Sequence, residues 1–240
     1  MEGVKPIRLA ISNGWDIKSF VYARGSELSD WALELLGSGS ARQAIELPPA
    51  LMQALSEKEH TSEILATISI RDDSIWSVPK HPPFAAVVLD RPGSPGNLGT
   101  IIRTSCAFGL NGVVLFGHAV DLYDPHTIRA SVGTIFSIPV GVADSRAEVL
   151  SWLANLREQY PNLLVVGTSA KAVDSIEECD FKLPSVIIMG NETRGMSGFL
   201  RNTCDLLAKI EIKGSAGSLN VATAAAIALH ELSRKRRLAT

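Results

Sequence analysis

The chain has 240 residues and a formal net charge of −2, and 46% of its residues are hydrophobic while 20% are charged. This length allows one large α/β domain or an ordinary domain with a small one, and the composition excludes a disordered chain. The near-neutral charge provides no overall attraction to nucleic acid, so RNA or DNA must be bound by local patches. The basic run at 234–237 is one candidate patch, but it equally fits a solvated helix end that complements the helix dipole.

The cysteines and histidines give no sign of a metal site or a disulfide framework. Cys106, Cys179 and Cys204 lack the spacing of a zinc site, and the five histidines form no ligand pattern. The first residues carry no long apolar region, and no stretch reaches the length of a membrane span. We therefore expect a reduced, cytoplasmic protein with no metal and no membrane partner.

The first part of the chain alternates short apolar runs with helical patterns. The stretch 26–39 (SELSDWALELLGSG) opens on a capping serine followed by glutamate and closes on glycine, which predicts a helix. The predicted strands are 17–23, 42–48 and 63–70.

A charged, proline-rich stretch at 71–83 with little periodicity separates this part from the next. We predict a small α/β domain over 1–75, a linker over 76–83 and a second domain over 84–240.

The second part contains short, β-branched runs separated by helical patterns. These predicted strands are 85–90, 112–117, 162–169, 185–190 and 207–212. Strands that are apolar on both faces and alternate with helices predict a mostly parallel sheet with helices on both faces. Ligands bind such sheets beyond the carboxyl ends of the strands. Three polar loops follow predicted strands there, at 90–97, 190–197 and 213–220, and we expect a site where they meet.

In the first loop, Asn97 is expected to cap a helix that carries Arg103 one turn after Gly99. Helical side chains lean toward the N-terminus, so we expect the guanidinium to pass over Gly99 and reach the helix mouth. A cation there opposes the helix dipole unless an anion shares the site. An arginine paired with a structural carboxylate explains the same segment equally well.

The second loop places Glu192 and Arg194 directly after a buried strand, with Gly190 and Gly195 allowing close backbone approach. Taken alone, it also fits an ordinary turn with a surface ion pair.

In the third loop, Ser218 or Asn220 can cap an alanine-rich helix that must be buried in the core or against another subunit. One cap explains one of these two polar residues but not both.

Several common enzyme motifs are missing from the sequence. There is no GxxxxGK[ST] phosphate loop, no GxGxxG after the first strand of the second part, and no GxSxG elbow. A nucleoside triphosphate site, a dinucleotide-binding domain and serine hydrolase chemistry are therefore disfavoured.

Three ordered motifs span residues 85–232, and the segment 129–140 lies between the first two. The matching positions are Asn97, Gly99, Arg103 and Ala107 to Gly109, then Gly190, Glu192, Gly195 and Ser197, then Ser218 to Val221. Together they resemble the SpoU/TrmH family of RNA ribose 2′-O-methyltransferases, members of the SPOUT superfamily with its trefoil-knotted α/β fold. The N-terminal part resembles the small substrate-recognition domain that many members carry.

The resemblance implies an S-adenosylmethionine cofactor, an RNA partner and a homodimer in which each subunit helps to build the other's site. It implies cofactor contacts from Thr168, Gly190, Ile210 and Leu219. It implies catalytic or substrate-holding roles for Arg103, Asn97, Glu192, Ser218 and Asn220. Because arginine has a very high pKa, we expect Arg103 to orient a phosphate and stabilise developing negative charge rather than to act as the base. Ribosomal RNA is favoured over transfer RNA because the N-terminal domain resembles that of ribosomal members.

One position departs from the family pattern. The third motif usually begins Ile-Pro-Met, but here Ile210, Glu211 and Ile212 stand in its place, so a charge enters a ring that is apolar in the family. A catalytically silent RNA-binding relative is therefore the main alternative. Methylation of a base nitrogen and a nucleotide-binding oxidoreductase are the others, and the Asn97 and Arg103 pair argues for ribose.

Overall fold

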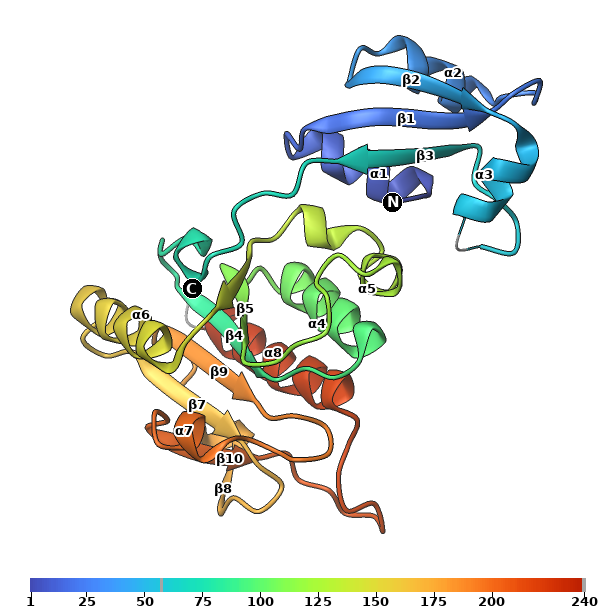
Figure 1. The fold of residues 1–240 in the computed structure, drawn as a ribbon. Coiled ribbons are helices and arrows are strands. Elements are labelled where there is room, and N and C mark those ends of the chain that lie inside the picture. Colours follow the sequence, from blue (N-terminus) through green and yellow to red (C-terminus); the bar gives the residue numbers. More distant parts are fainter. Residues whose placement is uncertain (57, 239–240) are drawn as a thin grey trace. The chain divides into compact units, whose positions relative to one another are not determined.

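The computed structural model describes residues 1–56 and 58–238, so the last two residues of the predicted 84–240 domain lie outside the described residues. The chain forms two compact units. The first comprises residues 1–71 together with 132–137, and the second comprises the rest. Figure 1 shows the elements of each unit.

The first unit is a three-stranded mixed sheet with three helices. The strand order is β2-β1-β3, in which β1 pairs parallel with β2 and antiparallel with β3. The elements are α1 (Val4–Ser12), β1 (Ile17–Ala23), α2 (Asp30–Gly37), β2 (Ala41–Leu47), α3 (Pro49–Leu55), β3 (Ile64–Ile68) and the 3₁₀ turn η2 (Thr134–Phe136). All three predicted strands are present.

Helix α2 begins later than its sequence pattern predicts. The cap is Ser29 rather than Ser26, and its Oγ accepts a hydrogen bond from the Ala32 amide. The Ser29 amide and hydroxyl also donate to the Glu63 carboxylate at 2.8 and 2.7 Å. This tie to the segment before β3 is a tertiary contact, which a local capping pattern does not reveal.

The second unit is built on a seven-stranded sheet in the order β6-β5-β4-β9-β7-β10-β8. Each pairing between neighbouring strands is parallel, as predicted. The strands are β4 (Ala85–Asp90), β5 (Gly112–Phe116), β6 (Val140–Ala143), β7 (Leu164–Thr168), β8 (Asp174–Ser175), β9 (Ser185–Met189) and β10 (Leu206–Lys209). The five predicted strands are all found. The sequence analysis missed β6 and β8, which are too short to show a periodic pattern.

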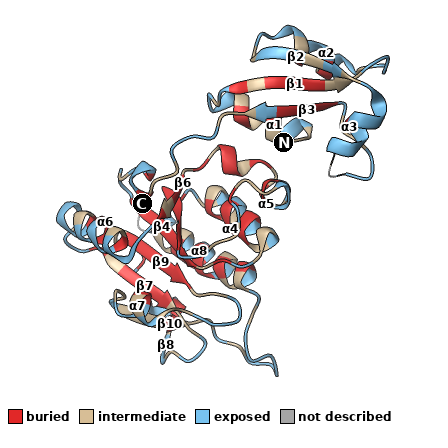
Figure 2. Cartoon of the chain, viewed as in Figure 1, coloured by how far each residue is buried: buried red, intermediate tan, exposed pale blue. Residues whose placement is uncertain are grey.

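Helices cover both faces of this sheet. They are α4 (Pro95–Ala107), α5 (Pro125–Ala130), α6 (Arg146–Gln159), α7 (Gly198–Arg201) and α8 (Val221–Arg237), with 3₁₀ turns η1 (Ile75–Ser77) and η3 (Ile176–Glu178). Trp152 and Leu156 of α6 pack against Val88 and Ile188 on one face. Helix α8 contacts α4 and β9, and α4 contacts β5, on the other face. The central strands are buried throughout, as Figure 2 shows.

The second unit starts before the predicted boundary. Ile75, the residue before the predicted linker, and Val78, within it, are both buried in the main core cluster of the second unit. The Val142 amide donates to the Asp73 carbonyl, and Ser74 forms a parallel bridge with Val142. The charged and proline-rich composition of 71–83 conceals the packing of its few apolar residues.

The basic run at the end of α8 holds the second unit together. Arg234 forms a bidentate ion pair with Glu231, with hydrogen bonds of 2.7 and 2.8 Å. Lys235 and Arg236 donate to backbone carbonyls, which are those of Glu177, Cys179, Phe181, Leu183, Pro83 and Phe84. The charged groups of residues 234–236 are therefore already engaged within the chain, but Lys235 and Arg236 are packed against backbone carbonyls and are not solvated, as the helix-end interpretation expects.

Candidate functional site

A cavity of about 650 Å³ lies at the carboxyl ends of β7, β9 and β10. Its wall includes all four residues expected to contact a cofactor, Thr168, Gly190, Ile210 and Leu219. Glu192, Ser218 and Asn220 line the same cavity. Strand order explains the convergence, because β4 and β9 are neighbours with Leu89 beside Met189, and β7 and β10 follow on the same side. Volumes of a few hundred cubic ångströms are typical of small-molecule sites.

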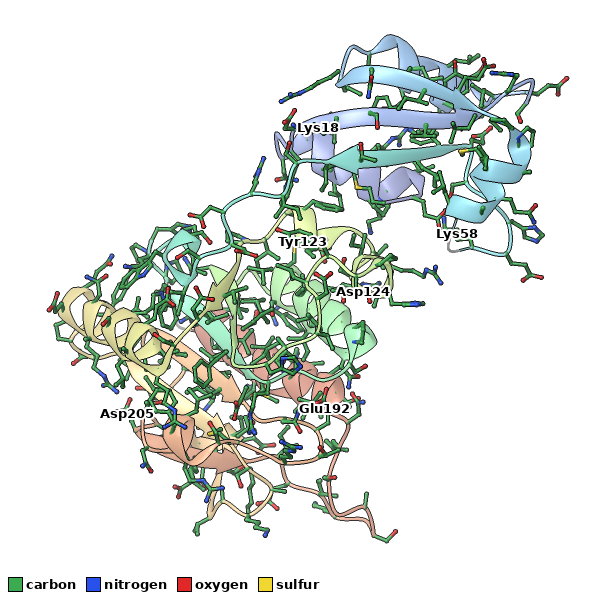
Figure 3. The ribbon with its side chains drawn as sticks, viewed as in Figure 1. Lys18, Lys58, Tyr123, Asp124, Glu192 and Asp205 are labelled. Atoms are coloured by element: carbon green, nitrogen blue, oxygen red, sulfur yellow. The ribbon has the colours of Figure 1, made fainter. Side chains whose placement is uncertain are left out.

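Asn97 joins the three polar loops through its side-chain amide. Its Nδ2 donates to Glu192 Oε1 at 3.1 Å, and its Oδ1 accepts from Asn220 Nδ2 at 3.1 Å. Asn220 Oδ1 in turn accepts from the amides of Ala222 and Thr223, which confirms it as the cap of α8. Figure 3 labels Glu192 on the loop that follows β9. Residues far apart in the sequence therefore form one hydrogen-bonded chain beside the cavity.

Asn97 itself is not the cap of α4, contrary to the sequence prediction. The cap is Ser94, whose Oγ accepts from the Asn97 amide, and Pro95 occupies the first helical position. Proline is favoured there because its missing N–H would have no helical partner. Placing Asn97 inside the first turn frees both ends of its amide to reach the other two loops.

Arg103 does not follow the path expected for it. The space over Gly99 is filled by α5 and the residue after it, since an added Cβ would lie 2.4 Å from the Thr127 carbonyl oxygen and 2.8 Å from the Ser131 nitrogen. Gly99 is therefore required by helix packing. Arg103 is exposed, lines neither cavity found at this edge, and makes no hydrogen bond or ion pair with any described residue. The alternative of a buried pair with a structural carboxylate is wrong as well.

The loop 190–197 folds back on itself beside the cavity. Asn191 and Gly195 exchange two backbone hydrogen bonds, and a Cβ at Gly190 would lie 2.4 Å from the Met196 nitrogen. Glu192 Oε2 accepts from Asn191 Nδ2 at 3.2 Å. Glu192 is therefore held by amides rather than paired with Arg194, and the surface ion pair expected of an ordinary turn does not form.

Asp90 and Arg91 anchor this loop, and the sequence analysis did not single them out. The Asp90 side chain is fully buried and accepts two hydrogen bonds from Arg91 at 2.8 and 3.0 Å and one from the Ser197 amide. This pairing raises the pKa of Arg91. Arg91 adopts a φ of +52°, and its Nη2 donates to the Gly195 carbonyl at 3.1 Å. An aspartate ending a wholly apolar strand was the available signal.

Glu211 does not place its charge in the cavity. Its neighbours Ile210 and Ile212 line the wall, whereas Glu211 is exposed and forms an ion pair with Lys209 at 3.1 Å. The departure from the family pattern thus leaves the apolar wall intact at this position.

Within residues 1–56 and 58–238, no group of His, Cys, Asp and Glu side chains has a geometry that could hold a metal ion. No helix in the same part of the chain is long and apolar enough to cross a membrane. None of the three cysteines, all of which lie in the described part of the chain, forms a disulfide, and burial raises the pKa of Cys204 to about 12.

Comparison with known proteins places the chain among RNA methyltransferases. Residues 85–230 match the SpoU rRNA Methylase family, and residues 1–66 match the SpoU L30e-like domain. A 23S rRNA (uridine(2479)-2'-O)-methyltransferase of Streptomyces viridochromogenes is 38% identical over 234 residues, which cover 98% of this chain and 82% of that protein.

Solved structures agree with the match. The SpoU methyltransferase AviRb from Streptomyces viridochromogenes, in complex with the cofactor AdoMet, gives a TM-score of 0.93 at 39% identity and covers 99% of this chain and 89% of that chain. An AdoMet-bound rRNA methyltransferase from Sinorhizobium meliloti gives a TM-score of 0.84 at 30% identity, and the match covers 98% of this chain and 86% of that chain.

Proposed function

The chain belongs to the SpoU rRNA methylase family, and on that basis we propose that it transfers a methyl group from S-adenosylmethionine to a ribose 2′-hydroxyl of ribosomal RNA. The observation that carries the proposal is the hydrogen-bonded chain of Glu192, Asn97 and Asn220 beside a cavity lined by the four expected cofactor residues. The match of residues 1–66 to a SpoU L30e-like domain supports RNA as the substrate and supports a recognition role for the N-terminal unit.

The cavity fits the cofactor in size and in chemistry. Gly190, Ile210 and Leu219 line it, and their backbone groups would hold the edge of an adenine, while Ile212 and Met189 supply apolar wall. Thr168 is held in place because its hydroxyl donates to the Ile188 carbonyl at 3.1 Å. When bound, S-adenosylmethionine supplies an electrophilic methyl group on its sulfonium.

The polar side chains at the cavity are suited to holding the acceptor. Glu192, Asn97 and Asn220 already hold one another, so they reorganise little when the ribose arrives. Ser218 lines the cavity and makes no hydrogen bond with any described residue, which leaves its hydroxyl for the substrate. Together they would fix the ribose so that its 2′-oxygen faces the methyl group.

We assign Arg103 to the site of a second copy of the chain. It is exposed, has no partner among the described residues, and does not line the cavity of its own chain. Helix α8 has an incompletely covered apolar surface, where Ile227 is 39% exposed. In a homodimer, Arg103 from one copy would orient a phosphate and stabilise developing charge on the acceptor oxygen in the other. The trefoil knot implied by the family resemblance stays a prediction.

The first test is transfer of tritiated methyl groups from S-adenosylmethionine to unmodified ribosomal and transfer RNA, followed by nucleoside analysis. We expect label in a 2′-O-methyl nucleoside from the ribosomal pool. Label on a base nitrogen, or in transfer RNA alone, would contradict the proposal.

Mixed dimers test where Arg103 acts. Arg103→Ala and the cavity-filling Leu219→Trp should each be inactive alone. After the two proteins exchange subunits, about a quarter of wild-type activity should return if the arginine acts across the dimer, because half of the dimers then contain one intact site. An inactive mixture, with exchange verified by tagged subunits, would place the arginine in its own chain's site.

The structure removes the reason for which a catalytically silent RNA-binding relative was considered. Glu211 pairs with Lys209 away from the cavity and so does not obstruct the cofactor. Calorimetric titration with S-adenosylmethionine separates the two functions, because a scaffold of this kind would show no binding.

A further inference from the structure

Three basic side chains line the cavity without a partner. Lys171 lies in the turn after β7, Arg194 in the loop after β9, and Arg201 at the end of α7. Each is exposed, and none donates a side-chain hydrogen bond or forms an ion pair with a described residue. Charged side chains gathered from three separate segments on one cavity wall indicate an anionic ligand.

No carboxylate of the described residues forms an ion pair with these cations, and the cavity wall carries one carboxylate against three cations. Glu192, the acidic residue of the wall, is held by the side-chain amides of Asn97 and Asn191. Asp205, labelled in Figure 3, forms an ion pair with Arg157 at 2.9 Å and accepts from the Val165 amide. Glu211 is paired with Lys209. The cavity wall therefore carries an excess of positive charge.

We propose that Lys171, Arg194 and Arg201 bind the RNA phosphodiester backbone next to the acceptor nucleotide and so guide the ribose into the cavity. The inference rests on the proposed function. A ribose 2′-hydroxyl is on the carbon beside the one that bears the 3′-phosphate, so an acceptor cannot enter the cavity without bringing a phosphate to its rim. With a net charge of −2 on the whole chain, RNA must be attracted by local groups of this kind.

The carboxylate of the cofactor is the competing source of negative charge, and it explains the cluster less well. It carries one negative charge, whereas three cations converge here from three segments. S-adenosylmethionine also bears a sulfonium and an ammonium group, so its overall charge is positive and additional cations oppose its binding. RNA carries one negative charge on every phosphate and can engage all three side chains.

The test compares Lys171→Gln, Arg194→Gln, Arg201→Gln and the triple variant with wild type. Lys182→Gln is the matched control, because Lys182 is an exposed lysine that lies just before β9, at the opposite end of that strand from the cavity. The measurements are binding of in vitro transcribed 23S ribosomal RNA over a range of salt concentrations, methyl transfer, and calorimetric titration with S-adenosylmethionine.

We expect each substitution to weaken RNA binding about three- to tenfold and to raise KM for RNA without weakening the binding of S-adenosylmethionine. The slope of log affinity against log salt should fall by about 0.7 for each side chain removed. Lys182→Gln should match wild type in all three measurements.

Unchanged RNA affinity and salt dependence in the triple variant would overturn the inference. Weaker binding of S-adenosylmethionine with unchanged RNA binding would assign the cluster to the cofactor carboxylate and overturn it as well. If wild type fails to methylate ribosomal RNA, the proposed function fails, yet the direct RNA-binding comparison still decides the role of the three side chains.

Discussion

Replacing Arg103 by alanine separates chemistry from folding unusually well. The side chain is exposed on α4 and makes no hydrogen bond or ion pair with a described residue. Loss of such a surface group changes the free energy of unfolding by no more than about 0.5 kcal/mol. Loss of one charged donor to a developing oxyanion lowers kcat about 10²- to 10³-fold, which corresponds to about 2.7–4 kcal/mol. The catalytic effect should therefore exceed the structural one several times over.

The assay is single-turnover transfer of tritiated methyl groups to unmodified ribosomal RNA, with calorimetric titration of S-adenosylmethionine and thermal unfolding measured alongside. Thr100→Ala is a suitable control, because Thr100 is exposed on the same helix and its hydroxyl donates only to the Gly96 carbonyl one turn earlier. Arg103→Lys keeps the charge but loses the planar fork, so we expect intermediate activity.

Three results would refute the reasoning. Transfer by Arg103→Ala within a few-fold of wild type would show that the arginine is not needed for chemistry. A loss of cofactor affinity equal to the loss of transfer would assign it to cofactor binding. A lower melting temperature would show that the side chain has a structural contact in the assembled protein.

Three further predictions concern stability. Gly99→Ala should lower the free energy of unfolding by about 1–3 kcal/mol, because the new methyl group would overlap the Thr127 carbonyl, and an unchanged urea midpoint would contradict this. Arg236→Gln should destabilise the protein by about 2–4 kcal/mol and leave RNA affinity unchanged, because the guanidinium donates hydrogen bonds to backbone carbonyls of the second unit. Weaker RNA binding at normal stability would instead indicate a basic RNA-binding patch. Hydrogen bonds from Arg234 hold the pKa of Glu231 below its ordinary 4.5. The stability that this carboxylate contributes is therefore complete above pH 4.5 and is lost as the pH falls through the lower pKa of the folded state. Glu231→Gln should flatten the acid limb of a curve of Tm against pH.

The sequence by itself determined five of the seven strands of the large sheet and the polar loops that follow them. Short, β-branched runs that are apolar on both faces are typical of buried parallel strands, so the strands at 85–90 and 185–190 could be predicted from the sequence pattern. The polar loops after these strands were recognisable because polar residues interrupt an apolar pattern there. Asn220 was one of two candidate helix caps, together with Ser218, because capping depends on neighbours within three residues, and the structure selects Asn220.

Only the tertiary structure decided which groups meet. Asn97 bonds to Glu192 and Asn220 because β9 lies beside β4 and α8 packs on α4, and strand order is not encoded in local periodicity. The missing side chain at Gly99 was expected to leave space for the Arg103 side chain, but α5 fills that space. The sequence pattern did not single out Asp90 and Arg91, yet they hold a loop about a hundred residues away. Each of these depends on contacts between segments distant in sequence, which local propensities and spacings cannot specify.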